Sequence, residues 1–261
     1  MKKSVLITSL FVAAAFVSQS ALAEVKIRAG AGSSTYELGG DYIHAKSTYS
    51  PTAFGVTFSS DTAANGAYID LGYSSGTGHH DGWAYLGTPA ESFKRQDIAL
   101  TGGVVFLNQN NGIAGNVYVG LKAGSTKLGA NKAVLIASPL TPWNANTAWS
   151  EETFDTTGVV FGGGASFPVA GGRAGSVGVN LGIGIMGATW KDNSNAGFSS
   201  KANTALGGSI GANYTFPFTP HFGVVADYKY QSYSYKFGST ANPFTVDEKF
   251  STLMGFLYAK F

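Results

Sequence analysis

The sequence predicts an all-β protein, an antiparallel transmembrane up-and-down β-barrel of ten strands, with eight or twelve strands as the alternatives. Three observations lead to this fold. Charged residues make up only 12% of the chain, whereas glycines number 36 and aromatic residues reach 13%, so the surface would be poorly soluble in water. After residue 23, no apolar stretch approaches the roughly 20 residues of a spanning helix. Apolar and polar residues instead alternate with period two, as in the wall of a barrel, whose closure satisfies every backbone polar group.

The N-terminal segment is typical of a secretory signal peptide. Two lysines precede an apolar stretch at about 5–17, and residues 21–23 form an A-x-A-like cleavage site. We therefore expect a signal peptide at 1–23 and a barrel domain at 24–261. Removing the signal peptide leaves 15 basic and 15 acidic residues, so the charge gives no reason to expect nucleic acid as a partner. The chain contains no cysteine, which excludes disulfides and thiolate metal sites.

Ten segments carry the period-two pattern. In the clearest of them, one face consists of Val177, Val179, Leu181, Ile183 and Ile185, and the other of Gly178, Asn180, Gly182, Gly184 and Met186. In chain order, we expect strands at roughly 24–36, 48–60, 66–76, 94–107, 113–126, 153–168, 174–190, 200–217, 221–237 and 247–261.

The links between these strands alternate in length. Those after the second, fourth, sixth and eighth strands are short and turn-like, with the sequences DTAANG, NQNNG, VAGGR and TPH. Bacterial barrels place such turns, and both termini, on the periplasmic side. Two aromatic girdles are predicted. The girdle near the short turns is expected to contain Phe106, Phe167, Phe216, Phe222 and Phe261, and the girdle near the long links Tyr36, Tyr73, Trp190, Tyr230 and Tyr233.

With these features, the chain resembles small Gram-negative outer-membrane β-barrel proteins over the whole of 24–261. In that family, the last strand ends on an aromatic residue after alternating apolar residues, and the barrel-assembly machinery reads this segment. The resemblance implies this role for Leu253, Leu257 and Phe261. It also implies a location in the cell outer membrane, in contact with its lipid and lipopolysaccharide. A soluble exported sandwich that ends on Phe is the alternative.

If the apolar sets face lipid, the opposite positions place charges of both signs in the lumen. These lumen-facing residues are Arg28, Asp70, Asp97, Lys122, Asp227 and Lys229. Asp97 and Lys122 fall near the outer rim on neighbouring strands, where we expect them to pair, and Arg28, Asp70 and Asp227 fall in the lower half. A structural network of ion pairs and selectivity for a permeating solute both account for such charges.

Strands six to eight also turn a run of glycines inward. Its members are Gly158, Gly162, Gly164, Gly178, Gly182, Gly184, Gly207 and Gly211, among which Gly162, Gly182 and Gly207 would border a pore. Because these residues lack side-chain volume, a barrel of ten strands would retain a narrow water path. The alternative is that the glycines relieve crowding around Tyr118, Met186 and Trp190.

The long link at 127–152 contains the apolar run AVLIASPL at 133–140. Such a run is too hydrophobic for a freely solvated link. It would pack in the barrel mouth, meet lipid or a partner, or form a strand pair of its own, which would raise the strand count to twelve.

Patterns that resemble catalytic or cofactor sites are weak. The glycine-rich segments GAGAGSS, FGGGAS and GLKAGSTK do not fit the phosphate-loop pattern. His79, His80 and Asp81 fall together on an expected outer loop, but adjacent side chains in extended structure point apart. The chain has neither the Asp-x-His couple of the omptin proteases nor the Ser-His pairing of the lipid A deacylases. We therefore expect no catalytic residue, no metal and no cofactor.

The sequence-based hypothesis for function is a passive porin-like channel for small solutes, which the polar, glycine-rich inner wall favours. The alternative is a non-conducting structural or adhesive outer-membrane protein that acts through its extracellular loops. The apolar run at 133–140 favours this alternative.

Overall fold

The computed structural model describes residues 22–40, 44–60, 65–81, 91–108, 111–131, 149–192, 199–202, 204–239 and 242–261. The strands are β1 (Leu22–Gly40), β2 (His44–Tyr49), β3 (Thr52–Ser60), β4 (Asn65–Asp81), β5 (Glu91–Asn108), β6 (Ile113–Asn131), β7 (Trp149–Pro168), β8 (Ser176–Asp192), β9 (Ser199–Lys201), β10 (Ala205–Pro217), β11 (Phe222–Ser239) and β12 (Asn242–Lys260). One short 3₁₀ turn, η1 (Val169–Gly172), joins β7 to β8. Within the described residues, no helix has the length and apolar character needed to cross a membrane.

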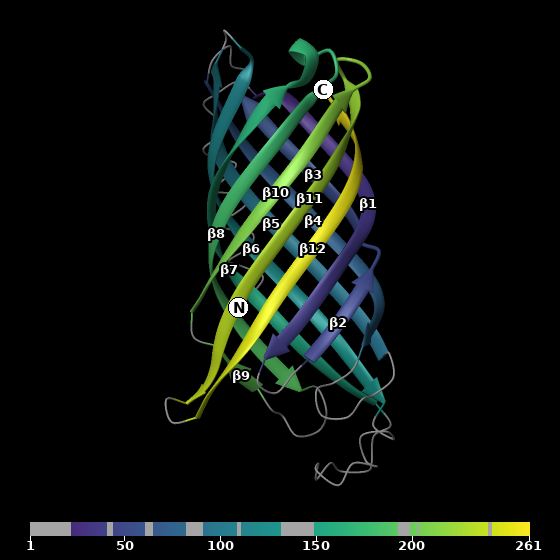
Figure 1. The fold of residues 1–261 in the computed structure, drawn as a ribbon, viewed down its shortest axis with the longest axis vertical. Helices are drawn as coiled ribbons and strands as arrows, with labels where there is room; N and C mark the ends of the chain where they lie inside the picture. The colour runs from purple at the N-terminus through teal and green to yellow at the C-terminus, as the bar shows by residue number, and fades with distance from the viewer. Residues whose placement is uncertain are drawn as a thin grey trace.

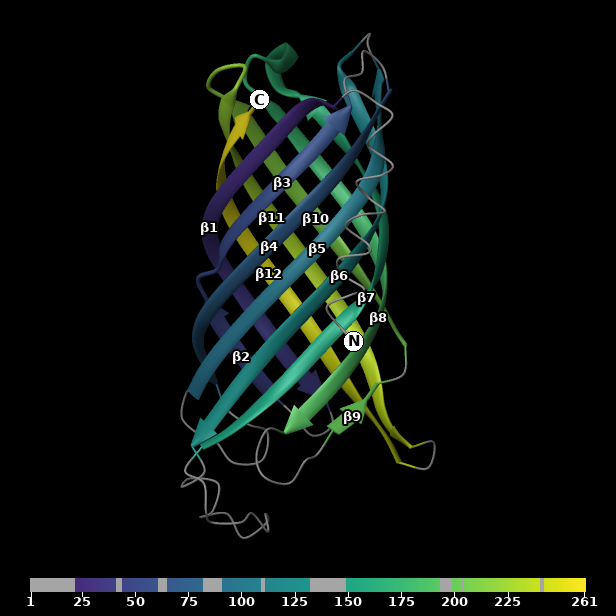
Figure 2. The same cartoon turned by 180° about the vertical axis from the view of Figure 1, so that it is seen from behind.

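Neighbouring strands pair antiparallel around a ring (Figures 1 and 2). From β1, the pairings run through β2 and β3 to β4, then through β5, β6, β7 and β8 to β10, β11 and β12, and β12 pairs with β1. β2 and β3 share one place in the ring, and β9 pairs with β8 beside β10. The twelve described strands therefore fill about ten places. The expected all-β antiparallel fold is confirmed, and ten to twelve strands are consistent with it.

The strands extend further toward the long links than the sequence pattern indicated. β4 runs from Asn65 to Asp81, where we expected a strand over 66–76, and it therefore contains His79 and His80, which we had assigned to a loop. This assignment is wrong because the alternation continues there in polar residues. The first 21 residues, most of the expected signal peptide, lie outside the described residues.

The long link between β6 and β7 adds length to existing strands. The pairing of these two strands continues as far as Asn131 opposite Trp149. The ends of the predicted link at 127–152 therefore belong to the walls of the ring. The apolar run at 133–140 lies outside the described residues.

One face of each strand is apolar and points out of the ring. Leu181, Leu206 and Leu257 keep 63%, 69% and 67% of their surface exposed. Such exposure of large aliphatic side chains is the reverse of a soluble core and matches a wall that faces lipid. The apolar set predicted on β8, and Leu253, Leu257 and Phe261 at the end of the chain, agree with this orientation.

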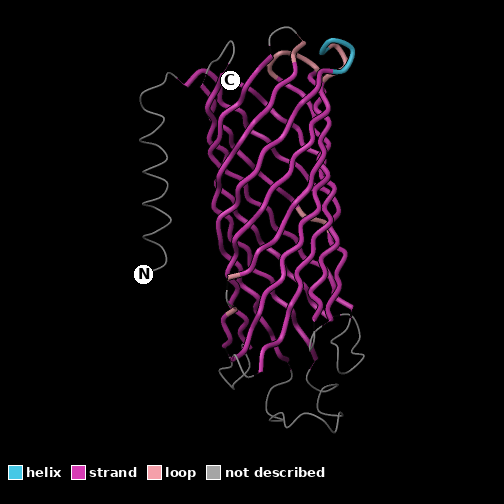
Figure 3. Tube along the Cα trace, turned by 60° about the vertical axis from the view of Figure 1, so that its left-hand side comes forward, coloured by secondary structure: helices cyan, strands magenta, loops and turns pink. Residues whose placement is uncertain are grey.

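The apolar belt covers only part of each strand. On β8 it spans the nine residues Val177–Ile185 out of 17, close to the 9 to 11 residues that a tilted strand needs to cross the bilayer. Beyond it, the outward positions become polar, and cross-strand ion pairs appear. Lys127 Nζ lies 2.7 Å from Glu151 Oε1, and Lys191 Nζ lies 2.8 Å from Asp155 Oδ2. The wall therefore has a membrane half, next to the short turns, and a projecting half, next to the long links. In Figure 3, the 3₁₀ turn η1, in cyan, and the C-terminus mark the end of the ring that carries the short turns.

The projecting half encloses a hydrophobic core inside the ring. Tyr36 and Tyr235 are fully buried, and Phe154 packs edge-on against Tyr235 with ring centroids 5.4 Å apart. The buried hydrophobic cluster consists of Tyr36, Leu38, Ala45, Tyr49, Phe93, Leu128, Phe154, Met186, Ala188, Trp190, Ala205, Tyr233, Tyr235, Phe237, Val246 and Phe250. Aromatic rings thus fill the lumen at this level, as side chains fill the interior of small barrels.

This core corrects the predicted outer girdle. Tyr36, Trp190 and Tyr233 lie inside the ring, because they occupy inward positions of their strands. Only Tyr73 and Tyr230 of the predicted set are exposed on the outside. Near the short turns, the girdle is present as expected. Its exposed members are Phe106, Phe167, Phe222 and Phe261.

Candidate functional site

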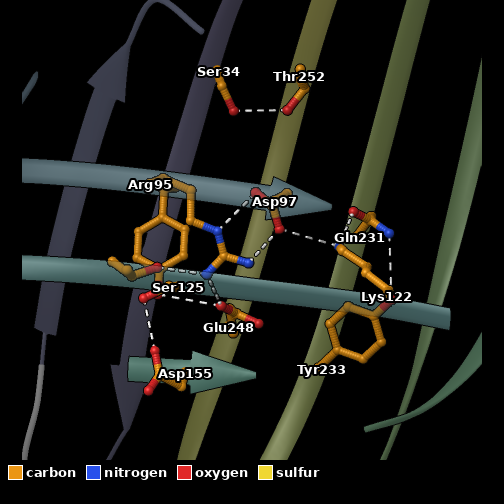
Figure 4. A network of polar contacts seen from close by, with 12 residues as sticks. Ser34, Arg95, Asp97, Lys122, Ser125, Asp155, Gln231, Tyr233, Glu248 and Thr252 are labelled. Atoms are coloured by element: carbon orange, nitrogen blue, oxygen red, sulfur yellow. Dashed lines mark hydrogen bonds and ion pairs between the residues drawn. The ribbon is translucent and has the colours of Figure 1, made fainter. Parts of the chain in front are cut away.

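The most concentrated polar chemistry of the described residues lies in the lumen, just beneath the aromatic core, and centres on Arg95 of β5 (Figure 4). Its guanidinium makes a bidentate contact with Asp97, through Nε to Oδ2 at 2.9 Å and Nη2 to Oδ1 at 2.7 Å. Its Nη1 donates to Glu248 Oε1 of β12 at 2.9 Å and to Thr126 Oγ1 of β6 at 2.6 Å. Only 1% of the Arg95 and Glu248 side chains is exposed. The cation is therefore held by two carboxylates in a dry environment.

Aromatic rings enclose this ion cluster. The guanidinium carbon of Arg95 lies 4.6 Å from the ring centre of Phe250 and 5.7 Å from that of Tyr36. The hydroxyl of Tyr235 donates to Glu248 Oε2 at 3.1 Å. Both oxygens of the Glu248 carboxylate are thus hydrogen-bonded, which offsets the cost of burying the charge.

Lys122 of β6 sits at the edge of the cluster and contacts Asp97 only at long range. Lys122 Nζ lies 4.0 Å from Asp97 Oδ1, and it donates to Gln231 Oε1 of β11 at 2.8 Å. The structure therefore brings the expected pair of Asp97 and Lys122 together, but Arg95 is the closer partner of the aspartate.

Sequence reasoning missed Arg95 and Glu248, although the signal was present. Arg95 is two residues before Asp97 and hence on the same face of β5. Glu248 shares its face of β12 with Met254 and Tyr258, which are buried in the lumen. Extending the period-two pattern past the apolar belt would have placed both residues inside.

A second ion pair lies in the membrane half, between Arg28 of β1 and Asp70 of β4. Nη1 and Nη2 of Arg28 donate to the two oxygens of Asp70 at 2.6 and 2.8 Å, and Thr57 Oγ1 of β3 donates to Asp70 Oδ1 at 2.6 Å. Both charged side chains remain 23% exposed. Asp227 and Lys229 occupy half-buried inward positions of β11 at neighbouring levels. The inward charged side chains of this part of the lumen are half-buried, whereas the aromatic side chains of the core are buried.

The inward glycines lie against large side chains. A Cβ atom at Gly182 would come within 2.9 Å of the Tyr118 hydroxyl and 2.8 Å of Ser209 Oγ, and one at Gly207 would come within 2.7 Å of the Tyr233 ring. The Tyr118 ring also lies directly over Gly162. The glycines accommodate tyrosine rings, as in cross-strand aromatic pairing with glycine. Gly162, Gly182 and Gly207 thus make room for the Tyr118 and Tyr233 rings.

The histidines of β4 point to opposite sides of the wall. His79 is exposed outside, whereas His80 is buried and its Nε2 lies 2.9 Å from the Gly129 carbonyl oxygen. No group of three or more His, Asp or Glu side chains able to hold a metal occurs in the described segments.

A solved structure shares this arrangement of strands. The outer membrane protease OmpT from Escherichia coli aligns with a TM-score of 0.57 over 92% of this chain and 97% of its own, at 10% identity. This likeness shows that the fold is an antiparallel β-barrel of the same kind as that of OmpT. The transport unit of the autotransporter AIDA-I from Escherichia coli aligns with a TM-score of 0.47, over 92% and 90% of the two chains at 11% identity. The translocator domain of NalP from Neisseria meningitidis aligns with a TM-score of 0.46, over 97% of this chain and 95% of its own, at 12% identity. No family model and no curated protein matches the sequence.

Proposed function

We propose that this chain is a non-conducting outer-membrane barrel that acts through its extracellular end, as a structural or adhesive protein. The observation that carries the proposal is the buried aromatic core of the projecting half, where Phe154 packs against Tyr235, and Tyr36 packs against Phe250 beside Arg95. Ions and solutes do not pass a close-packed layer of aromatic rings, because the layer leaves no space for water to follow.

The outer surface supports the same proposal. Above the apolar belt, the outside of the projecting half is hydrophilic and carries cross-strand ion pairs. The inside holds a hydrophobic core that packs against the strands. Contacts on both faces make this part of the wall rigid. Binding surfaces on a rigid scaffold lose little conformational entropy on contact with a partner. A rigid extracellular rim is therefore suited to contact with molecules outside the cell.

The proposed role is not enzymatic. A general base needs a carboxylate or imidazole that can take up a proton at working pH. In the Arg95 cluster, both oxygens of Asp97 accept hydrogen bonds from Arg95, and the two oxygens of Glu248 accept from Arg95 and Tyr235, so neither carboxylate is placed to receive a proton from a substrate. These groups are therefore better explained as structural ion pairs.

A channel is the second candidate, and one observation favours it. The membrane half of the lumen is lined with Arg28 and Asp70, which keep 23% of their side chains exposed. A solute could enter this polar chamber from the periplasmic end, but passage would require the aromatic core to move.

Conductance of the refolded protein in planar bilayers decides between the two candidates. We expect no single-channel events from the wild type, and no solute uptake in liposome swelling. Phe154→Ala combined with Tyr235→Ala should create openings, because it removes two rings from the core. Leu206→Ala, on the lipid-facing wall, is the matched control. Regular conductance by the correctly folded wild type would overturn the non-conducting proposal and favour the channel.

Biogenesis is part of the proposal. We propose that residues 1–23 direct export and that Leu253, Leu257 and Phe261 are read by the barrel-assembly machinery. The outward exposure of all three residues supports this role, since a recognition segment has to be accessible. Deletion of Phe261 should lower the folded fraction seen as heat-modifiable mobility on gels, while export continues. Normal assembly of the truncated chain would contradict this role.

A further inference from the structure

The projecting half of the wall is divided into two groups of strands. In the first, which we call the closing panel, the outer ends of β11, β12, β1 and β2 pair with one another side by side. In the second, the main panel, the outer ends of β4, β5, β6, β7 and β8 do the same. The closing panel consists of residues 34–40, 44–49, 234–239 and 242–250. The main panel consists of residues 77–81, 91–97, 122–131, 149–156 and 188–192.

The first joint between the panels lies between β2 and β4, whose pairing covers only Lys46–Tyr49 on the β2 side. Below it, the pairing with both neighbouring strands is interrupted at Pro51, although β3 resumes in the same register. Pro51 accepts a hydrogen bond from Gly32 N at 3.1 Å, but it cannot donate one in return because proline has no N–H. Above it, Ser47 Oγ donates to the His79 carbonyl oxygen at 2.7 Å. This joint is weakened but connected, as a hinge requires.

The second joint lies between β9 and β11. The pairing of β10 with β11 ends at Gly207 opposite Tyr233. Above this level, β9 follows β8 with a shift of one residue relative to β10, and it does not pair with β11 in the part of the chain that the structure describes. Figures 1 and 2 show the outer ends of β11 and β12 leaning out of the ring, away from β9. Because no ladder of hydrogen bonds has to be broken here, the panels separate most easily at this joint.

The aromatic core is the interface between the two panels. Tyr36 and Tyr49 of the closing panel pack against Phe93 of the main panel, with ring centroids 5.3 and 4.9 Å apart. On the other side of the core, Phe154 of the main panel packs against Tyr235 of the closing panel at 5.4 Å. Each panel thus buries an aromatic face against the other, as two packed subdomains do.

An ion pair joins the panels at the centre of this interface. Arg95 belongs to the main panel, and Glu248, whose Oε1 lies 2.9 Å from its Nη1, belongs to the closing panel. The other carboxylate on Arg95, that of Asp97, comes from the same strand and therefore stays within the main panel. Closer to the membrane half, Lys122 of the main panel donates to Gln231 of β11 at 2.8 Å. The two carboxylates of one arginine thus have different mechanical positions.

We propose that the projecting half is a two-panel device, in which the closing panel swings about the joint at Pro51, parts from β9, and is held shut by the pair of Arg95 and Glu248. Each panel moves as a rigid unit, because its strands stay paired. Opening exposes the aromatic faces of both panels at the outer end of the barrel. The membrane half keeps its shape, since the pairing of β10 with β11 is continuous there.

The movement is measured as the distance between two nitroxide spin labels, by double electron–electron resonance on the protein refolded into lipid vesicles. The chain contains no cysteine, so labels attach only to cysteines that are introduced. Lys94→Cys with Ser234→Cys places one label on each panel, at exposed positions on opposite sides of the ring. Thr77→Cys with Thr189→Cys places both labels on the main panel and is the control pair.

Glu248→Gln removes the charge from the contact between the panels. We expect a second, longer distance between the labels at positions 94 and 234, in a population about tenfold larger than in the wild type, as for the loss of one charge-assisted hydrogen bond. The distance between the control labels should stay single. Asp97→Asn is the matched variant, because it removes a charge from the same arginine within one panel. It should leave both distances unchanged.

Arg95→Met breaks the contact from the other side and should give the same longer distance. A single, unchanged distance between the panels in both Glu248→Gln and Arg95→Met would overturn the device. An equal change at the control labels would also overturn it, because the whole projecting half would then have lost its structure. Equal opening in Asp97→Asn and Glu248→Gln would show that the pair of Arg95 and Glu248 does not hold the panels together.

Discussion

The two halves of this barrel have opposite interiors and opposite surfaces, although most of the strands run through both of them. In the membrane half, Leu181 and Leu257 face out, and Arg28 pairs with Asp70 inside. In the projecting half, lysines and carboxylates face out, and Phe154 and its neighbours fill the inside. The pairing of β7 with β8 runs through both halves without a shift. The solvent on each side, lipid or water, therefore decides which face is apolar.

The first prediction sharpens the comparison at the ion cluster. Arg95→Met removes the cation that two buried carboxylates share, and it should lower the free energy of unfolding by about 3 to 5 kcal/mol. Urea titration in detergent measures the loss. Lys127→Met removes one partner of an exposed pair and should cost less than about 1 kcal/mol. Similar losses for the two variants would show that the projecting lumen is wet.

The second prediction tests where the membrane half ends. Ile183→Arg places a charge in the apolar belt and should cost about 2 to 4 kcal/mol in vesicles. Thr189→Arg, on the same face of β8 but above the belt, should cost close to nothing. The two variants are compared by urea titration in phosphatidylcholine vesicles. Equal penalties would mean that lipid covers the projecting half as well.

A third prediction concerns the contact of the glycines with the tyrosines. Gly182→Ala adds a methyl group close to the Tyr118 hydroxyl and to Ser209 Oγ, so overpacking should cost about 1 to 3 kcal/mol. If the clash is with the tyrosine, the double variant with Tyr118→Leu should recover part of the loss, and a double-mutant cycle measures this coupling. If the losses of unfolding free energy in the two single variants simply add, the methyl group and the Tyr118 ring do not touch, and a water path between them remains possible.

The smallest effect is expected at the outer surface. Glu37→Gln removes the carboxylate that separates Lys249 from Lys46, and it should cost at most about 1 kcal/mol because both members of the pair are largely exposed. Added salt should reduce the difference from the wild type, since salt screens exposed charges. If the loss of unfolding free energy persists at high salt, the pair of Glu37 and Lys249 is shielded from solvent.

The sequence was sufficient for most of the membrane half. Large aliphatic residues at every second position, as in Val177–Ile185, identify the lipid-facing side directly, and the orientation of Arg28 and Asp70 follows from it. The projecting half was harder to predict. Its outward residues are polar and small, and its large apolar residues face the lumen. Tyr36 and Trp190 were therefore assigned to a girdle.

Side-chain contacts between distant strands were the second limit. Period two gives the face of a residue but not its level relative to a strand far away in the sequence. The partners of Arg95 depend on the stagger of β5 relative to β12, which only the closed set of pairings fixes. The glycines were likewise identified as inward, while the rings that occupy the space beside them come from neighbouring strands.

The seam between β1 and β12 has a consequence for the order of folding. It joins the first strand of the ring to the last, and its contacts link residues far apart in the chain, such as Ser34 and Thr252, whose hydroxyls are 2.7 Å apart. The same last strand carries Glu248, so Arg95 has no acceptor on β12 until that strand arrives. Contacts between residues so far apart in the chain form slowly, because the chain loses conformational entropy when it closes the loop, before the contact can stabilise it. The nascent chain must therefore be kept from aggregating until its final strand is available. The arrival of that strand completes the ring of pairings and at the same time adds a second carboxylate to the buried cation, which Asp97 already binds from β5.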